Sequence, residues 1–150
     1  MNIAVFFGGR SCEHDISIIT GVQVLNALGD GYRVLPVYMK EGGFYTSDLM
    51  PDVGFFENPN LKKATRIWLI DGSFYTRKGM LLLKKETPDV ALICCHGGEG
   101  ENGVLQGFLE YNGVPYTSAG LIASSVCMDK SIAKQLLDGL MLNTMPSITV

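Results

Sequence analysis

The first turn of the chain restricts the possible folds more than any other stretch. A short apolar run, Ile3 to Phe7, stops at the glycine pair Gly8-Gly9. Charged residues follow, and from Ile16 to Leu28 apolar residues recur at every third position. A short apolar run ended by glycine is typical of a strand buried on both faces, and the recurrence indicates an amphipathic helix. The stretch predicts a strand, a tight loop and a helix, the unit in which α/β domains present backbone N–H groups to ligands.

The same pattern recurs further along the chain. Residues 89–95 form a second buried strand and end at a second glycine-rich loop, 96–103. The remaining expected elements are strands over 32–39, 44–46 and 115–117, helices over 104–111, 121–127 and from 129 or 131 to 139, a linker at 144–146 and a strand beginning at 148. Strand and helix alternate, which predicts a parallel sheet.

Three features qualify this pattern. Pro36 favours an edge position for the 32–39 strand, because proline cannot donate to a central ladder. Residues 47–66 carry many turn formers and predict an irregular excursion with at most one short helix. Runs at 67–70, 73–76 and 80–83, the first two joined by Asp71-Gly72, predict a small antiparallel meander.

The predicted fold is therefore α/β: a mostly parallel, doubly wound, Rossmann-like sheet with helices on both faces and a small antiparallel hairpin excursion. In such sheets ligands bind beyond the carboxyl ends of the strands. The loops after Phe7 and after Cys95 follow two of these ends, so we expect both to line one crevice.

Composition limits the function classes. The 150 residues suit one domain, and a net charge of −3 without a Lys/Arg stripe argues against nucleic-acid binding. No apolar stretch reaches the roughly 20 residues that span a membrane, and no basic leader precedes the first strand. Adjacent Cys94 and Cys95 should point to opposite faces of a strand, which suggests buried thiols in a reducing cytoplasm.

The first loop lacks the spacing of a P-loop and of a dinucleotide fingerprint. A tight turn capped by Ser11 and a ligand site explain the first loop equally well from its spacing. Glu13-His14-Asp15, however, carries more charge than a helix cap needs. A carboxylate facing a crevice can hold an ammonium group by charge-assisted hydrogen bonds.

The second loop opens with His96. A free histidine side chain has a pKa near neutrality, which suits ordering an amine or a carboxylate. Gly97-Gly98 let a ligand approach the backbone closely. Glu99 is interpreted as charge at a helix start, and Gln106 as a residue on the polar side of its helix. A zinc site is conceivable, but no ligand pair has a recognised local spacing, so no metal ligand is assigned.

Three segments together resemble the N-terminal domain of D-alanine–D-alanine ligases of the ATP-grasp superfamily. They are FFGGRSCEHDIS (6–17), HGGEGENGVLQGFLEYNGVPYTSAG (96–120) and ASSVCMDKSIAK (123–134). Their order and spacing make the resemblance specific, and residues 45–85 match least. The fold implied is the Rossmann-like pre-ATP-grasp domain, with 1–145 as the first-substrate domain and 146–150 as the start of a linker or strand.

The resemblance also implies residue roles. Glu13 matches the glutamate that holds the ammonium of the first D-alanine, and Ser17 the serine that supports it by hydrogen bonding. His96 and Gly97 match the loop at the first-substrate subsite. Lys130 matches the lysine that reaches ATP phosphates. Supporting positions are expected at His14, Glu101 and Gln106.

The implied reaction joins two D-alanines for peptidoglycan. ATP phosphorylates the carboxylate of the first, and the amine of the second displaces phosphate from the acyl phosphate. The implied partners are D-alanine, ATP and Mg²⁺, with the magnesium ligands outside these residues. The resemblance also implies a homodimer and a location in the cytoplasm. Phe55-Phe56 and Trp68 could form an interface or cover the sheet. The fragment alone is expected to be inactive.

Two alternatives stay open. One is a non-catalytic α/β module that binds a small molecule. The other is a different ATP-grasp ligase, such as one that makes D-alanyl-D-lactate or D-alanyl-D-serine.

Overall fold

The computed structural model describes residues 1–57 and 61–148. The strands are β1 (Asn2–Gly8), β2 (Arg33–Lys40), β3 (Gly43–Thr46), β4 (Thr65–Ile70), β5 (Ser73–Lys78), β6 (Leu81–Glu86), β7 (Val90–Ile93) and β8 (Tyr116–Thr117). The helices are α1 (His14–Leu28), α2 (Val104–Tyr111), α3 (Leu121–Met128) and α4 (Lys130–Gly139). Short 3-10 turns lie at Gly29–Gly31, Val53–Phe56, Leu61–Lys63 and Gly98–Gly100.

Within the described residues the strands form one sheet in the order β6-β5-β4-β3-β2-β1-β7-β8. The pairs β2–β1, β1–β7 and β7–β8 are parallel, and helices α1 and α2 provide the crossovers from β1 to β2 and from β7 to β8. The predicted α/β class is confirmed. The antiparallel strands β3 to β6 continue the same sheet, and Asp71 and Gly72 take the positive φ values of 47° and 71° that a tight hairpin turn requires.

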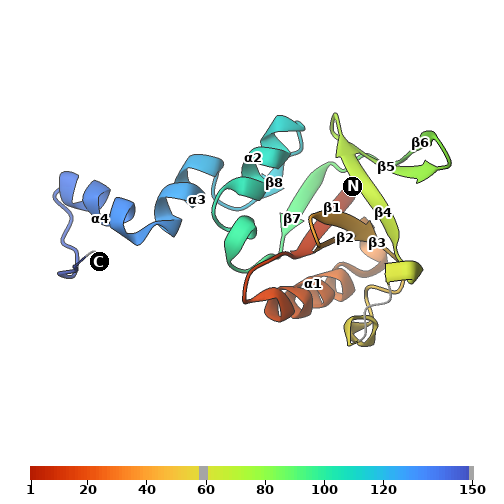
Figure 1. Ribbon diagram of the computed structural model, residues 1–150, viewed down its shortest axis with the longest axis horizontal. Coiled ribbons are helices and arrows are strands. Elements are labelled where there is room, and N and C mark those ends of the chain that lie inside the picture. Colours follow the sequence, from red (N-terminus) through yellow and green to blue (C-terminus); the bar gives the residue numbers. More distant parts are fainter. Residues whose placement is uncertain (58–60, 149–150) are drawn as a thin grey trace.

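Helices cover both faces of the parallel half, as predicted (Figure 1). Alternate residues of β1 point to opposite sides, so each face has its own core. The α1 side joins Ile3, Val5 and Phe7 to Ile18, Val22 and Leu25. The α2 side joins Ala4 and Phe6 to Leu105 and Leu109. Cys94 belongs to the first core and Cys95 to the second, in agreement with the predicted alternation.

The inward face of α1 differs from the predicted one. Ile16 and Ile19 are exposed, whereas Ile18, Val22 and Leu25 are buried. A strict three-residue recurrence drifts around a helix of 3.6 residues per turn, so the stripe at spacings of four and three faces the sheet instead. The same side of α1 carries Gly21, where a Cβ would stand 2.4 Å from Cγ of Phe7.

The predicted edge position of the second strand is wrong, because β2 lies between β1 and β3. The reason Pro36 is tolerated is local. β3 pairs only with Tyr38–Lys40, while β1 runs beside the whole of β2. At Pro36 the strand therefore has a neighbour on one side only, which leaves room for a residue without an N–H.

In α2 the interpretation of Gln106 as a polar-side residue is also wrong. Gln106 is 1% exposed, while Val104 is 62% exposed. Leu105 and Leu109 belong to the core, and Gln106 donates to the Gly100 carbonyl in the loop before the helix.

The described part of the excursion contains 3-10 turns rather than an α-helix. Phe55 and Phe56 pack against the α1-side core, which supports the reading that they cover the sheet. Trp68 is half-buried, and the Arg66 guanidinium carbon lies 5.6 Å from its ring centroid.

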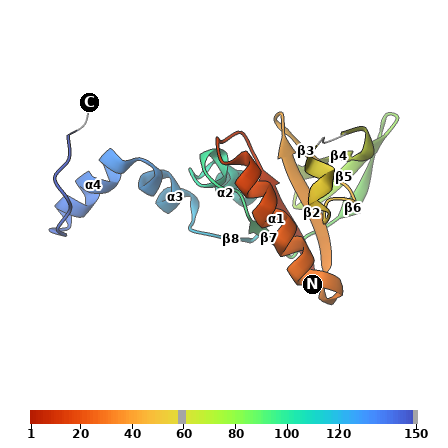
Figure 2. The same cartoon turned by 90° about the horizontal axis from the view of Figure 1, so that it is seen from below.

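Helices α3 and α4 form an arm that extends away from the sheet, as Figures 1 and 2 show. Residues of α4 are exposed, including Ile132, Leu136 and Leu137. The strand predicted from Ile148 falls mainly on residues 149 and 150, outside the described residues. Within the described ranges, no helix is both long enough and apolar enough to cross a membrane.

Candidate functional site

The two glycine-rich loops meet at the carboxyl ends of β1 and β7. Ser11 joins them: its hydroxyl donates to the His96 carbonyl at 2.5 Å and accepts from the Glu13 N–H at 3.1 Å. Because β1 and β7 are parallel neighbours, their loops emerge at the same edge of the sheet. The expectation that both loops line one crevice is therefore confirmed. Ser11 serves this junction rather than capping α1, whose N-cap residue is Glu13.

Glu99 makes a second connection between the loops. Its Oε1 accepts from the Arg10 backbone N–H at 3.1 Å and lies 3.8 Å from Nε of the Arg10 side chain. The earlier interpretation of Glu99 as simple helix-start charge is replaced by this contact. Sequence reasoning missed the pair because the two residues are far apart in the chain and neither belongs to a local pattern.

Glu13 stands at the N-terminal end of α1 and is exposed to solvent. Its carboxylate lies against Gly97 on the other loop: a Cβ at Gly97 would be only 2.7 Å from Oε2 of Glu13. Gly97 also has φ of +66°, which disfavours a side chain. The structure thus brings Glu13, Gly97 and the backbone of His96 together. An accessible carboxylate in this position can accept hydrogen bonds from a primary ammonium.

The Ser17 hydroxyl bonds to the ends of two strands. It accepts from the Gly8 N–H at 2.7 Å and donates to the Cys94 carbonyl at 3.1 Å. The side chain is completely buried. The backbone N–H of Ser17 donates to the Glu13 carbonyl at 2.9 Å, so the hydrogen bond between Ser17 and Glu13 runs through the main chain, and a substrate contact by Ser17 stays a prediction. The hydroxyl fastens the ends of β1 and β7 to α1.

His14 stabilises the glycine turn, consistent with a supporting position. Its Nδ1 lies 2.6 Å from the Gly9 carbonyl oxygen and its Nε2 3.1 Å from the Tyr38 hydroxyl. A carbonyl oxygen only accepts, so Nδ1 carries a proton. Burial, with a smaller effect of Asp15 and Glu41, raises the pKa of Tyr38 to about 12, so the phenol remains a donor.

His96 is half-buried and contacts the first turns of α1. Its Nε2 lies 2.9 Å from the Thr20 hydroxyl, which also donates to the Ile16 carbonyl at 3.1 Å. Thr20 was not a candidate in the sequence. The residue lies two turns into a predicted helix, where a threonine carries no functional signal by itself.

The other supporting candidates shape the second loop. Gln106 donates from Nε2 to the Gly100 carbonyl at 2.9 Å and to the Ser118 hydroxyl at 3.3 Å. Within the described residues its Oε1 is buried without a hydrogen-bond partner. Glu101 is exposed, and its backbone N–H donates to the Gly98 carbonyl at 3.2 Å.

Lys130 is not brought to this crevice. It is exposed at the start of α4, on the arm that extends away from the sheet (Figure 2). Asp129 caps the helix by accepting from the N–H groups of Ser131 and Ile132. Among residues 1–57 and 61–148, no three His, Cys, Asp or Glu side chains are grouped as metal ligands would be.

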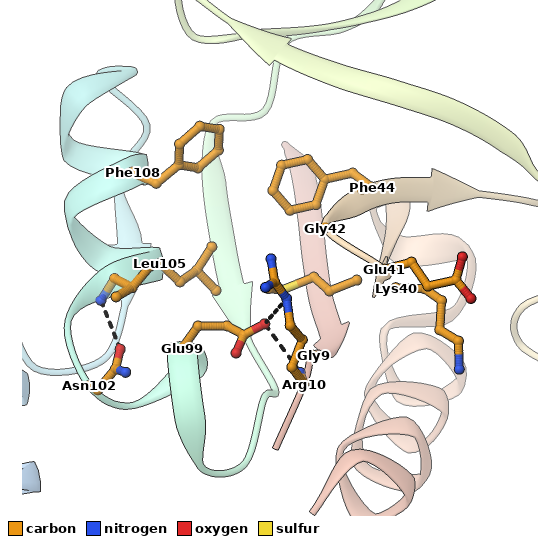
Figure 3. Close-up of a pocket in the computed structure, with 13 residues that line it drawn as sticks. Gly9, Arg10, Lys40, Glu41, Gly42, Phe44, Glu99, Asn102, Leu105 and Phe108 are labelled. Atoms are coloured by element: carbon orange, nitrogen blue, oxygen red, sulfur yellow. Dashed lines mark hydrogen bonds and ion pairs between the residues drawn. The ribbon is translucent and has the colours of Figure 1, made fainter. Parts of the chain in front are cut away.

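A cavity of about 440 Å³ opens on the α2 side of the loop junction (Figure 3). The rings of Phe44 and Phe108 face each other at one end, with centroids 5.6 Å apart. Arg10 and Glu99 form the opposite wall. The cavity shares these two residues with the loop junction, while Glu13 is not among its lining residues.

Comparisons with known proteins identify the family of the chain. A family model described as "D-ala D-ala ligase N-terminus" matches residues 2–119. A D-alanine–D-alanine ligase from Thermosipho melanesiensis is 39% identical over 145 residues, covering 91% of this chain and 39% of the relative. The chain thus spans about two-fifths of the length of such curated relatives.

Solved structures give the same result. A D-alanine–D-alanine ligase from Helicobacter pylori superposes with a TM-score of 0.85 at 25% identity, over 97% of this chain and 46% of that one. A D-Ala:D-Ser ligase from Enterococcus faecalis superposes with a TM-score of 0.74 at 25% identity, over 91% of this chain and 41% of that one. With a family model covering most of its residues, the chain belongs to the family of D-alanine–D-alanine ligase N-terminal domains.

Proposed function

We propose that this chain forms the first-substrate half of an ATP-dependent ligase that joins two D-alanines. The observation that carries the proposal is the contact between the loops, where the exposed Glu13 carboxylate lies against Gly97. A zwitterionic amino acid can place its ammonium on this carboxylate while Gly97 leaves room for its backbone. Family membership supports D-alanine as the amino acid.

In this proposal Glu13 holds the ammonium and so orients the carboxylate of the first D-alanine. The γ-phosphoryl group of ATP moves to a carboxylate oxygen, and ADP leaves. The amine of the second D-alanine then attacks the acyl carbon, phosphate leaves, and the amine gives up a proton. Holding the first substrate in one orientation turns each transfer into a reaction between positioned groups.

Lys130 would contact ATP phosphates, and Mg²⁺ would neutralise their charge, with ligands supplied by residues beyond these 150. The uncovered apolar side of α4 supports the idea that this arm packs against such residues. Because the chain spans 39% of the relative from Thermosipho melanesiensis, we expect the 150 residues alone not to catalyse the ligase reaction. ATP- and D-alanine-dependent phosphate release by the 150-residue chain would contradict this.

We place the complete enzyme in the cytoplasm, where peptidoglycan precursors are assembled, and regard a homodimer as its working form. The second substrate is D-alanine in this proposal. The similarity to a D-Ala:D-Ser ligase makes D-serine the competing candidate. Supplying D-alanine, D-serine or D-lactate to the complete protein and identifying the product by mass spectrometry separates these specificities.

The decisive experiment is phosphate release by the complete protein with Glu13→Gln. Loss of a hydrogen bond to a charged group should lower kcat/KM for the first D-alanine by roughly 10- to 100-fold. The matched control is Asp15→Asn, which removes one negative charge from the same first turn of α1. Asp15→Asn should leave kcat/KM within roughly threefold, because the helix dipole alone contributes under about 1 kcal/mol.

Equal effects of the two substitutions would contradict a specific ammonium site at Glu13. A complete protein that binds D-alanine but releases no phosphate would instead support the non-catalytic binding module.

A further inference from the structure

The contact between Thr20 and His96 determines how the histidine at the site is protonated. Thr20 has one hydroxyl proton, and it donates that proton to the Ile16 carbonyl at 3.1 Å. The hydroxyl oxygen can then only accept from the His96 ring, 2.9 Å away. The proton in this contact consequently belongs to Nε2 of His96.

A neutral imidazole with a proton on Nε2 has an unprotonated Nδ1, which is a hydrogen-bond acceptor. Within the described residues, Nδ1 of His96 makes no hydrogen bond, whereas both ring nitrogens of His14 have partners. His96 is also the residue before Gly97, whose Cα faces the Glu13 carboxylate. The acceptor without a partner among the described residues, Nδ1 of His96, therefore belongs to the glycine-rich loop that lies against Glu13.

We propose that Thr20 is a positioning residue that holds His96 as the Nε2–H tautomer, so that Nδ1 accepts a hydrogen bond from the ammonium of the first substrate. An ammonium has three N–H donors, and Glu13 does not use all of them. The proposal rests on the proposed function for the identity of the ligand, while the pairing of Thr20 with His96 stands without it.

The two histidines of the chain make the test specific. His14 must carry its proton on Nδ1, because its partner there is the Gly9 carbonyl oxygen. His96 must carry its proton on Nε2, because its partner there is the Thr20 oxygen. The chain contains only these two histidines, so they should give two opposite tautomers in one spectrum.

The experiment uses the 150-residue chain with ¹⁵N-labelled histidine at about pH 8, above the usual pKa of the side chain near 6.5. Long-range ¹H–¹⁵N correlation distinguishes protonated from unprotonated ring nitrogens, and His14→Gln assigns the remaining signals to His96. Thr20→Ser keeps the hydroxyl and should keep both tautomers. Thr20→Val removes it and should mix the tautomers of His96 while leaving His14 unchanged.

A wild-type His96 protonated on Nδ1, or identical His96 signals in the wild type and Thr20→Val, would overturn the pairing. An altered His14 signal in Thr20→Val would reveal general misfolding of that variant. The Thr20→Ala spectrum would then replace it, and His96 signals identical to those of the wild type would again overturn the pairing.

Calorimetric titration with D-alanine tests whether Thr20 affects the affinity for the first substrate. Thr20→Val should weaken binding by roughly tenfold, as expected for one misdirected hydrogen bond, and Thr20→Ser should bind like the wild type. Equal affinity in all three chains would overturn the positioning role. A wild-type chain that binds no D-alanine would overturn the ligand role of Nδ1, whereas the spectra alone decide the tautomer and phosphate release by the complete protein decides the proposed function.

Discussion

Tyr38 donates through its hydroxyl to the ring of His14, 3.1 Å away, and so connects the buried side of β2 to the first glycine turn. The opposite ring nitrogen of His14 lies 2.6 Å from the Gly9 carbonyl oxygen. Tyr38 is fully buried, so its position is set by the core. The turn that carries Ser11 and Glu13 is therefore anchored to the sheet through this pair.

Removing the hydroxyl should loosen this anchor. Tyr38→Phe is expected to lower the free energy of unfolding by about 1 kcal/mol, because the partner nitrogen of His14 loses its donor. Urea denaturation followed by circular dichroism measures the change. Tyr75→Phe is the control, since Tyr75 is half-buried and its hydroxyl makes no hydrogen bond within the described residues. Equal losses in both variants would refute the anchor.

The contact between Gly97 and Glu13 allows a test with a matched glycine. Gly97→Ala would place Cβ 2.7 Å from Glu13 Oε2 at φ of +66°, while Gly79→Ala has a similar φ of +62° and no atom within 4 Å. Both should lose about 1 kcal/mol of stability from the left-handed backbone. Only Gly97→Ala should also weaken D-alanine binding, by roughly tenfold or more, because the carboxylate must move.

Calorimetry measures the affinity of both alanine variants. Wild-type affinity in Gly97→Ala would show that the position of the Glu13 carboxylate does not matter for the ligand.

Close packing of α1 on β1 predicts an intolerant glycine inside the helix. At Gly21 an added Cβ would meet Cγ and Cβ of Phe7 at 2.4 and 2.5 Å. Gly21→Ala should lower the free energy of unfolding by about 1–3 kcal/mol through overpacking, although alanine is the better helix former. Gly31→Ala, where no atom lies within 4 Å, should stay within about 0.5 kcal/mol of the wild type. A stabilised Gly21→Ala would contradict the packing.

The four thiols should divide into two classes. Cys12 and Cys127 are exposed, whereas Cys94 and Cys95 are buried, and burial raises the pKa of these two thiols to about 11 and about 12. Because the thiolate is the nucleophile, the aromatic disulfide reagent DTNB should label two thiols quickly at about pH 8 and the other two only after unfolding. Rapid reaction of all four thiols in the folded chain would contradict this burial.

The raised pKa values also predict how the free energy of unfolding changes with pH. In the unfolded chain these thiols ionise near pH 8.5 and Tyr38 near pH 10, below their folded values. The unfolded state therefore loses protons first, so the free energy of unfolding should fall as pH rises from about 9 to about 12. Urea titrations in reducing buffer measure this slope, and a constant stability over that range would contradict it.

Much of the fold and the place of the site follow from local sequence. The run from Ile3 to Phe7 and the glycines after it define β1 and its loop, and the second apolar run does the same for β7 and the loop at His96. Strand burial, turn formers and helix spacing are local signals, because they depend on neighbouring residues and backbone preferences. The convergence of the two loops follows from parallel pairing.

The tertiary structure alone decided which polar side chains are buried in the scaffold and which lie at the junction of the two loops. Ser17 is fully buried between β1 and β7, Gln106 is buried under the second loop, and Thr20 contacts His96. These outcomes depend on the rotation of α1 and α2 about their axes and on contacts across tens of residues. Sequence periodicity determines that a helix has an inward face, but packing against a particular strand determines which polar residues lie on it.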